Sequence, residues 1–240
     1  MKHLALFTLT LTLAGVSPLF AQSPPPQPAS PPPAAPAQTP PSTQPVYKPP
    51  LRGAPGGRIG GGTRGIAGET LSLSVLAPDD RALTISEQPT LYWFISGRTS
   101  HPVEIVVMDP SGVQPALDVN VPPPTAAGLH SIRLADHNIR LEPGIAYRWY
   151  VAVVADPARR SRDILAGGTV ERVEPAPDLS STLARVGPAE RASLYANAGL
   201  WYDALATLSQ MIEQSPGDPS PQQQRAALLK QVGLPDVGGP

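Results

Sequence analysis

Cysteine is absent from the 240-residue chain. Without thiols the protein can contain neither disulfide bonds nor a cysteine nucleophile, and zinc sites built on cysteine are excluded. An exported protein can use disulfides but does not need them. The folded part must therefore be stabilised by the burial of side chains.

Recognisable catalytic motifs are absent as well. The sequence contains no GxSxG elbow and no HExxH motif. The segment Asp136–Asn138 offers three consecutive polar side chains that resemble metal ligands. Consecutive side chains point in different directions, however, and suit a turn better than a single ion. We therefore expect no catalytic residues, no cofactor and no metal.

An excess of charge of one sign is also lacking, because 18 lysines and arginines stand against 19 aspartates and glutamates. This near-neutral balance argues against a nucleic-acid-binding protein, which carries a basic patch or stripe. We expect no nucleic acid among the partners.

Only one apolar run is conspicuous, from Leu4 to Val16, after the basic residue Lys2 and before the sequence SPLFAQ. A basic start, an apolar stretch too short to span a bilayer and a small residue at the cut are typical of a secretory signal peptide. This pattern predicts cleavage after Ala21, with an uncleaved anchor as the alternative. The chain is then a bacterial protein exported to the periplasm or the cell exterior, with no transmembrane segment after cleavage.

Proline dominates the next segment. Residues 22–50 contain 13 prolines and no charged residue before Lys48. The segment has almost no large apolar side chains to offset the entropy of ordering, so we expect a disordered linker with extended polyproline II character. A spacer is the favoured interpretation, and a docking site for a proline-recognition module is the alternative.

The stretch RGAPGGRIGGGTRG, residues 52–65, holds seven glycines, three arginines and no acid. It lacks the lysine and the strand–helix context of a nucleotide-binding loop. In one interpretation its backbone N–H groups and arginines bind an anion or an acidic partner. In the other, which we favour, it is an arm against the sheet, and its arginines pair with acids such as Asp156, Asp163 or Glu171.

A second arginine cluster lies in the predicted turn between the last two strands. A charged hairpin turn is commonly a solvated surface that blunts a sheet edge, but together with the arm it could form a basic binding face. The candidate partner- or anion-binding residues are therefore Arg52, Arg58, Arg64, Arg159, Arg160 and Arg162.

Short β-like runs follow from Leu71 onward. In TLSLSVLA, the residues Leu71, Leu73 and Val75 alternate with polar residues and share one face. The runs end at Pro, Gly or Asp, and no helical pattern interrupts them, which argues against a parallel α/β sheet. The sequence therefore predicts an α+β protein with an antiparallel immunoglobulin-like β-sandwich. The predicted strands lie within residues 70–77, 90–96, 103–109, 128–135, 146–156 and 163–173.

Helical spacing appears in the last quarter of the chain. One helix should end at Gly199, the next should run from about Leu200 to Gln214, and a third should begin with Ser220 and Pro221 as cap and first turn. Apolar residues recur there at steps of three or four. They are Leu194, Ala198, Trp201, Leu205, Leu208 and Ile212.

This helical block resembles one hairpin of the tetratricopeptide type. Since a solenoid needs about three repeats, we expect a small annex packed on the sandwich, with a peptide-binding groove as the alternative. Trp201 is expected in the core, although with Tyr202 and Asp203 it could form a ligand-stacking patch. The residues that match the repeat are Gly199, Trp201, Ala204 and Pro216.

Several short motifs occur in an order that is similar to one known family. The chain contains YKPPLRGAPGGRIGGGTRG, TLYWFIS, YRWYVAVVAD, RRSRD and AGLWYDALATL in succession. In this it resembles the bacterial family named domain of unknown function 928, over roughly residues 47–234. The resemblance implies a secreted or envelope protein without an assigned activity, so it supplies no catalytic residues.

These observations predict a non-enzymatic binding or accessory module for an envelope protein or an anionic envelope polymer. A hydrolase with scattered site residues and a self-associating structural protein are the alternatives. The predicted divisions are a signal peptide (1–21), a disordered linker (22–50), an arm (51–70), a β-sandwich (71–175), a helical annex (176–234) and a disordered tail (235–240).

Overall fold

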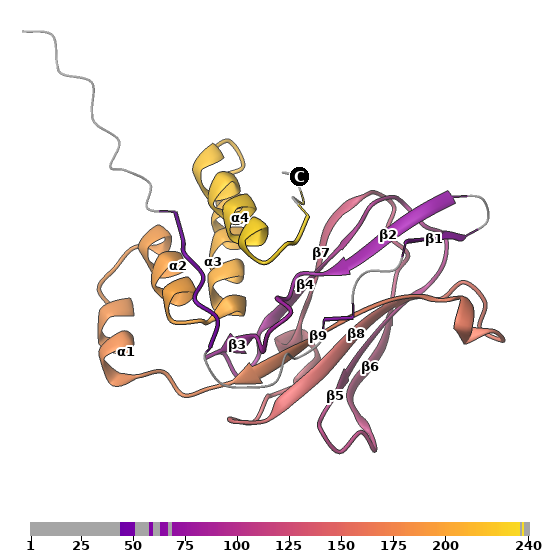
Figure 1. Cartoon of the computed structure of the whole chain (residues 1–240), viewed down its shortest axis with the longest axis horizontal. Helices are drawn as coiled ribbons and strands as arrows, with labels where there is room; N and C mark the ends of the chain where they lie inside the picture. Colours follow the sequence, from indigo (N-terminus) through magenta and orange to yellow (C-terminus); the bar gives the residue numbers. More distant parts are fainter. Residues whose placement is uncertain (1–43, 51–57, 60–62, 67–68, 236, 238–240) are drawn as a thin grey trace, which may run out of the picture. The chain divides into compact units, whose positions relative to one another are not determined.

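The strands of the protein form two sheets (Figure 1). This computed structural model describes residues 44–50, 58–59, 63–66, 69–235 and 237. One sheet has the order β1-β2-β4-β7 and the other the order β3-β9-β8-β5-β6. Neighbouring strands are antiparallel except β3 and β9, which are parallel. The strands are β1 (Thr63–Ile66), β2 (Glu69–Val75), β3 (Leu83–Thr84), β4 (Thr90–Ile95), β5 (Val103–Met108), β6 (Pro115–Val121), β7 (Gly128–Arg133), β8 (Ala146–Val153) and β9 (Ile164–Arg172).

The two sheets bury a common apolar core. Leu71, Leu73 and Val75 of β2 are all buried, as their alternation predicts. They share one hydrophobic cluster with Trp149 and Val151 of β8 in the other sheet. The α+β class with antiparallel sheets followed by helices is thereby confirmed, and the immunoglobulin-like character stays a prediction.

Two strands that the sequence patterns did not predict complete the five-stranded sheet. β6 forms one edge, and only Leu117 is fully buried there, between the exposed residues Ala116 and Asp118. β3 has two residues and pairs with Glu171 and Arg172 at the end of β9. A two-residue strand and a mostly exposed edge strand have little periodicity, which is why their pattern is weak.

Two adjacent glycines let the longest strands pack closely. A Cβ atom on Gly167 would lie 2.6 Å from the ring of Tyr150, and one on Gly168 would lie 2.8 Å from Cβ of Ala77. Because successive residues of a strand face opposite sides, Tyr150 covers one glycine on the outer face while Trp149 lies opposite Gly168 on the inner face.

Four helices follow the last strand and lie together beside the sheets (Figure 1). Within α3 the predicted stripe is confirmed, but Ala198 is exposed at the end of α2, where Ala192 and Ala196 are buried instead. The cap of α4 is Asp218, whose carboxylate accepts from the backbone N–H of Ser220 at 2.9 Å. No helix in the described ranges is both long and apolar enough to cross a bilayer. The helices are α1 (Pro177–Leu183), which the sequence patterns did not predict, α2 (Pro188–Asn197), α3 (Trp201–Gln214) and α4 (Pro219–Gln231).

Consecutive side chains at the start of α3 attach the helices to the sheets. Trp201 Nε1 donates to the carbonyl oxygen of Leu76 at 2.7 Å. The Tyr202 hydroxyl donates to the carbonyl oxygen of Thr169 at 2.7 Å and accepts from Trp149 Nε1 at 2.8 Å. Trp201 and Tyr202 are almost fully buried, so Trp201 belongs to the core, as expected.

Asp203 adds a third attachment of the same helix. Its Oδ2 accepts from the backbone N–H of Ile85, which follows β3, at 3.1 Å. Residues Trp201–Asp203 therefore contact β9 and the residues that directly follow β2 and β3, through hydrogen bonds that connect positions more than 30 residues apart in the chain.

Residues 44–50, which the sequence analysis included in the linker, lie against the helices and are called the strap below. Lys48 donates its backbone N–H to the carbonyl oxygen of Ala196 in α2 at 3.1 Å. Tyr47 is buried, and its ring meets Trp201 edge to face at a centroid distance of 5.0 Å. Figure 1 shows the strap in indigo beside α2.

The Tyr202 hydroxyl provides a test of this docking. In Tyr202→Phe, Trp149 Nε1 and the Thr169 carbonyl lose their buried partner, so the free energy of unfolding should fall by about 1–3 kcal/mol in urea titrations. Tyr47→Phe is the matched control, because the Tyr47 hydroxyl is buried with no hydrogen-bond partner among the described residues. Its stability should be higher, because a buried hydroxyl without a partner costs free energy. Equal losses in both variants would contradict the assigned role of Tyr202.

Candidate functional site

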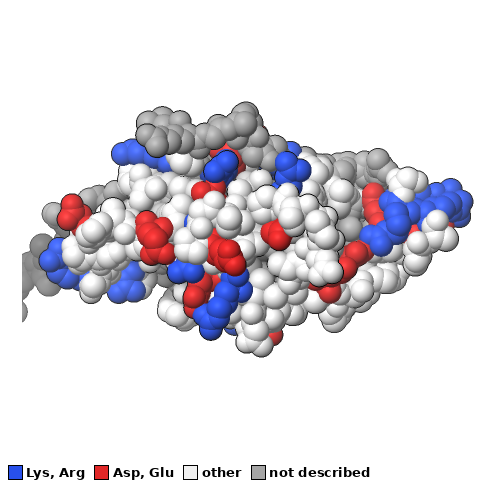
Figure 2. Space-filling model, turned by 90° about the horizontal axis from the view of Figure 1, so that it is seen from below, with Lys and Arg blue, Asp and Glu red and all other residues white. Residues whose placement is uncertain are grey.

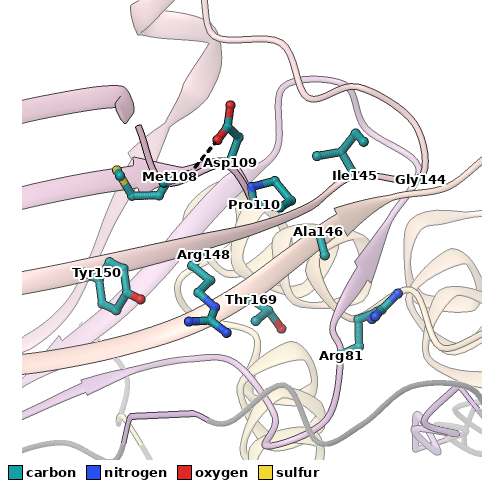
Figure 3. A pocket seen from close by; sticks show the side chains of 11 residues that line it. Arg81, Met108, Asp109, Pro110, Gly144, Ile145, Ala146, Arg148, Tyr150 and Thr169 are labelled. Atoms are coloured by element: carbon teal, nitrogen blue, oxygen red, sulfur yellow. Dashed lines mark hydrogen bonds between the residues drawn. The ribbon is translucent and has the colours of Figure 1, made fainter. Parts of the chain in front are cut away.

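A hollow of about 770 Å³ lies on the outer face of the five-stranded sheet (Figure 3). It is formed by β8 and β9, the end of β5 with the turn that follows, and the residues before β3. Its side walls combine apolar, aromatic and charged groups. The side chains that line it include those of Arg81, Met108, Asp109, Ile145, Arg148, Tyr150 and Thr169.

The strand alternation of β8 places the two largest of these side chains. Tyr147, Trp149 and Val151 are buried towards the core, so Arg148 and Tyr150 point to the opposite face. Arg148 stands directly opposite Met108 of β5 and Thr169 of β9. Figure 3 shows Tyr150, Arg148 and Thr169 following one another across the floor of the hollow.

Arg148 carries the uncompensated charge of the hollow. It is exposed, and no carboxylate of the described residues forms an ion pair with it. Arg81, by contrast, is paired with Glu171 at 2.7 Å. An arginine fork that lacks an internal partner suits a carboxylate or a phosphate, which it can bind through two parallel hydrogen bonds.

Asp109, the acid among the lining residues, is part of a turn. Its Oδ1 accepts from the backbone N–H groups of Ser111 at 2.8 Å and Gly112 at 3.2 Å. The hydrogen bond from the Ser111 side chain is the main reason why the pKa of Asp109 lies below its usual range. The carboxylate therefore stays ionised and is occupied by its own turn.

The predicted arm residues are only partly described. Arg52 lies outside the described residues, and Arg64 falls in β1 at a position whose side chain is not described. Arg58 Nε pairs with Asp79 at 3.1 Å, and Ile59 exchanges two backbone hydrogen bonds with Gly167 of β9. Ile59 thus attaches the arm to β9, and Arg58 attaches it to the connection between β2 and β3.

The second arginine cluster is largely neutralised by neighbouring acids. Arg159 Nε pairs with Asp156 at 2.7 Å, which lowers the pKa of that carboxyl. Arg160 pairs with Asp163 at 2.6 Å and also with Glu104. The acids that we expected beside the arm therefore belong to other arginines: Asp156 to Arg159, Asp163 to Arg160 and Glu171 to Arg81.

The two arginine groups do not meet in the described part of the structure. Arg58 contacts Asp79 and Ala77, whereas Arg160, in the short 3-10 helix η2 (Arg160–Arg162), contacts Glu104 and Asp163. Arg162 is exposed in the same turn. Basic and acidic side chains lie next to one another over the face shown in Figure 2. Binding roles for these arginines stay predictions.

The histidines in the described part of the chain lie apart from one another. His137 ends the 3-10 helix η1 (Leu134–His137), and the neighbouring Asp136 pairs with Arg133 at 3.0 Å. His130 stacks on Trp93 at a centroid distance of 4.6 Å, and burial lowers its pKa. The described residues contain no group of three or more histidine or carboxylate side chains placed to hold a metal ion.

Arg148 is the residue that the sequence reasoning missed. The available signal was a charged residue in the middle of the longest predicted strand, at the outward position between Tyr147 and Trp149. Sequence alone does not show which neighbouring strands flank that position, so the hollow could not be recognised.

Asp203 occupies a second, smaller hollow of about 230 Å³ between α3 and the loop that follows β3. Burial raises the pKa of its carboxyl to about 6, against the opposing effect of the hydrogen bond from the Ile85 N–H. Because the carboxylate joins α3 to the sheet, its titration concerns the stability of the helix attachment.

The chain was compared with models of known protein families. A family model described as Domain of Unknown Function (DUF928) matches residues 59–238, which include all nine strands and all four helices described above. No curated protein matches the chain. The resemblance to this family is confirmed, and the likeness of the helices to a tetratricopeptide hairpin stays a prediction.

Titration of Asp203 should be visible in the stability of the protein. An unfolded aspartate titrates near pH 4, so between about pH 4 and 6 the folded chain binds more protons than the unfolded chain. Stability from this group is then lost as the pH rises through 6. In Asp203→Asn that loss is absent, so the free energy of unfolding of the wild type, relative to the variant, should fall by on the order of 1–3 kcal/mol between pH 4 and 7. A difference that does not change with pH would contradict the raised pKa.

Proposed function

The chain belongs to the family described as Domain of Unknown Function (DUF928), and from its own geometry we propose that it is a non-enzymatic binding module of the bacterial cell envelope that holds an anionic polymer. The observation that carries this proposal is Arg148, which lines the outer hollow, is exposed and has no ion-pair partner among the described residues. The polymer presents a carboxylate or phosphate group to this side chain.

The residues that line the hollow on β8 are held in place by the strands on both sides. Tyr150 lies over Gly167, where no other residue would leave room for its ring. β8 is hydrogen-bonded on both sides, to β5 and to β9. A binding group on a central strand is positioned more precisely than one on a loop, so Arg148 and Tyr150 form a prepared surface.

The energetics favour a repeating ligand over a single small anion. An exposed ion pair contributes only about 0–1 kcal/mol and is screened by salt. Further affinity has to come from contact with the ring of Tyr150 and the side chain of Met108, which line the same hollow. A polymer that offers many equivalent anionic units raises the local concentration of binding groups.

The lining residues also support a binding role over catalysis. Asp109 is engaged by its own turn, and Arg81 is engaged by Glu171. General acid–base chemistry needs a second titratable group within reach of the reacting atoms. Export, inferred from the residues of the predicted signal peptide, would bring the mature protein to envelope polymers.

Binding to immobilised acidic polysaccharide tests the proposal. Polygalacturonate and a glycerol-phosphate polymer serve as carboxylate and phosphate probes, and neutral dextran serves as the negative control. Arg148→Ala should weaken binding to one of the two anionic probes by about two- to fivefold at low salt, since an exposed charge-assisted contact of up to about 1 kcal/mol is lost. Arg148→Lys should restore only part of it.

Arg185→Ala is the matched control, because Arg185 is another exposed arginine, in the loop between α1 and α2. This variant should bind like the wild type. Equal binding by Arg148→Ala and the wild type at low salt, or loss of binding in Arg185→Ala alone, would contradict a role for the hollow.

A further inference from the structure

The strap is held by the helices as an extended peptide would be held by a receptor. The side-chain amide of Gln231, at the end of α4, donates to the carbonyl oxygen of Pro45 at 2.8 Å and accepts from the backbone N–H of Tyr47 at 2.9 Å. The carbonyl oxygen of Ala196 accepts from the N–H of Lys48 at 3.1 Å. Three hydrogen bonds thus contact the main chain of the strap and do not depend on its side chains.

Side chains of the strap alternate between buried and exposed positions. Pro45 and Tyr47 are buried, whereas Val46 and Lys48 are exposed. Tyr47 packs against Trp201, one of the side chains that attach α3 to the sheets. The contact therefore selects one aromatic side chain with a proline two residues before it.

Gly199 permits the close approach of the strap. It adopts φ +75°, and a Cβ atom at this position would lie 2.9 Å from the carbonyl oxygen of Lys48. The surface that receives the strap, formed by Ala196, Gly199, Trp201 and Gln231, is called the strap site below.

Tyr47 packs well in the strap site except for its hydroxyl group. Its hydroxyl is buried without a hydrogen-bond partner among the described residues, and burial raises the pKa of Tyr47. A buried polar group without a partner costs free energy relative to an apolar group of the same shape. A phenylalanine fits the same contacts without that cost.

We propose that the strap site is a peptide-recognition site for an extended segment of another protein that carries phenylalanine between prolines, Pro-x-Phe-x-Pro. The chain's own strap is a tethered and imperfect occupant. Its attachment gives it an effective concentration in the millimolar range, which excludes weak ligands. A segment with phenylalanine displaces it, because that segment makes the same backbone hydrogen bonds without burying a hydroxyl.

Peptides with the sequence of residues 44–50 test this proposal on the mature chain carrying Tyr47→Ala, in which the tethered occupant loses its anchor. Three peptides differ only at the position of Tyr47: phenylalanine, tyrosine or alanine. By titration calorimetry the phenylalanine peptide should bind about tenfold more tightly than the tyrosine peptide, and the alanine peptide should not bind. On the wild-type chain all affinities should be lower.

Variants of the strap site distinguish specific peptide recognition from non-specific binding. Gln231→Ala, added to Tyr47→Ala, should lower the affinity for the phenylalanine peptide at least about tenfold, since two hydrogen bonds to the peptide backbone are lost. Lys230→Ala is the matched control, because Lys230 is the exposed neighbour of Gln231 on α4, and it should leave the affinity for this peptide unchanged. If Tyr47→Ala does not fold, Lys48→Pro replaces it, because this change removes the N–H that donates to Ala196.

Two results of the peptide titrations would overturn the proposal. Failure of the phenylalanine peptide to bind a folded variant would overturn it. So would phenylalanine and tyrosine peptides of equal affinity, which would leave a second copy of this chain as the better-suited source of the segment. Because the strap site is separate from Arg148, peptide binding does not depend on the proposed anion site.

Discussion

The structure depends on the insertion of Trp201, Tyr202 and Asp203 between elements that are far apart in the chain. Each side chain forms a buried or half-buried hydrogen bond to the sheets, at Leu76, Thr169 and Ile85 respectively. Trp and Tyr combine a large apolar surface with one polar group that needs a partner when buried. The polar groups of Trp201, Tyr202 and Asp203 all have partners in the sheets or their connections, so the first turn of α3 fixes the helices in one orientation.

Two surfaces follow from this attachment. On the outer face of the five-stranded sheet, the glycines of β9 leave room for the aromatic residues of β8, and Arg148 stands between Tyr150 and Thr169. On the helices, Trp201 presents the ring against which Tyr47 packs. The proposed anion site and the proposed peptide site thus rest on the same core but use separate residues, so one molecule with both would connect a polymer with a protein.

Much of the fold could be predicted from the sequence because alternation and helical spacing are local signals. The buried face of β2, the long strands β8 and β9, and α3 with its apolar stripe were identified in this way. The short strand β3, the edge strand β6 and the helix α1 have weak periodicity and were missed. Side-chain partners could not be predicted, since they depend on which distant segments meet: Arg58 pairs with Asp79, and the buried Tyr47 lies in a segment whose composition predicts a linker.

The hydrogen bonds at the start of α3 should make the sheets and the helices one cooperative unit. The most direct measurement is a urea titration of the mature protein that follows helix content by far-ultraviolet circular dichroism and the buried tryptophans by fluorescence. A cooperative unit gives a single transition with the same midpoint for both signals. Loss of the helical signal at a lower urea concentration, while the tryptophan of β8 remains in its native environment, would show that the helices are a separate appendage and would contradict the account.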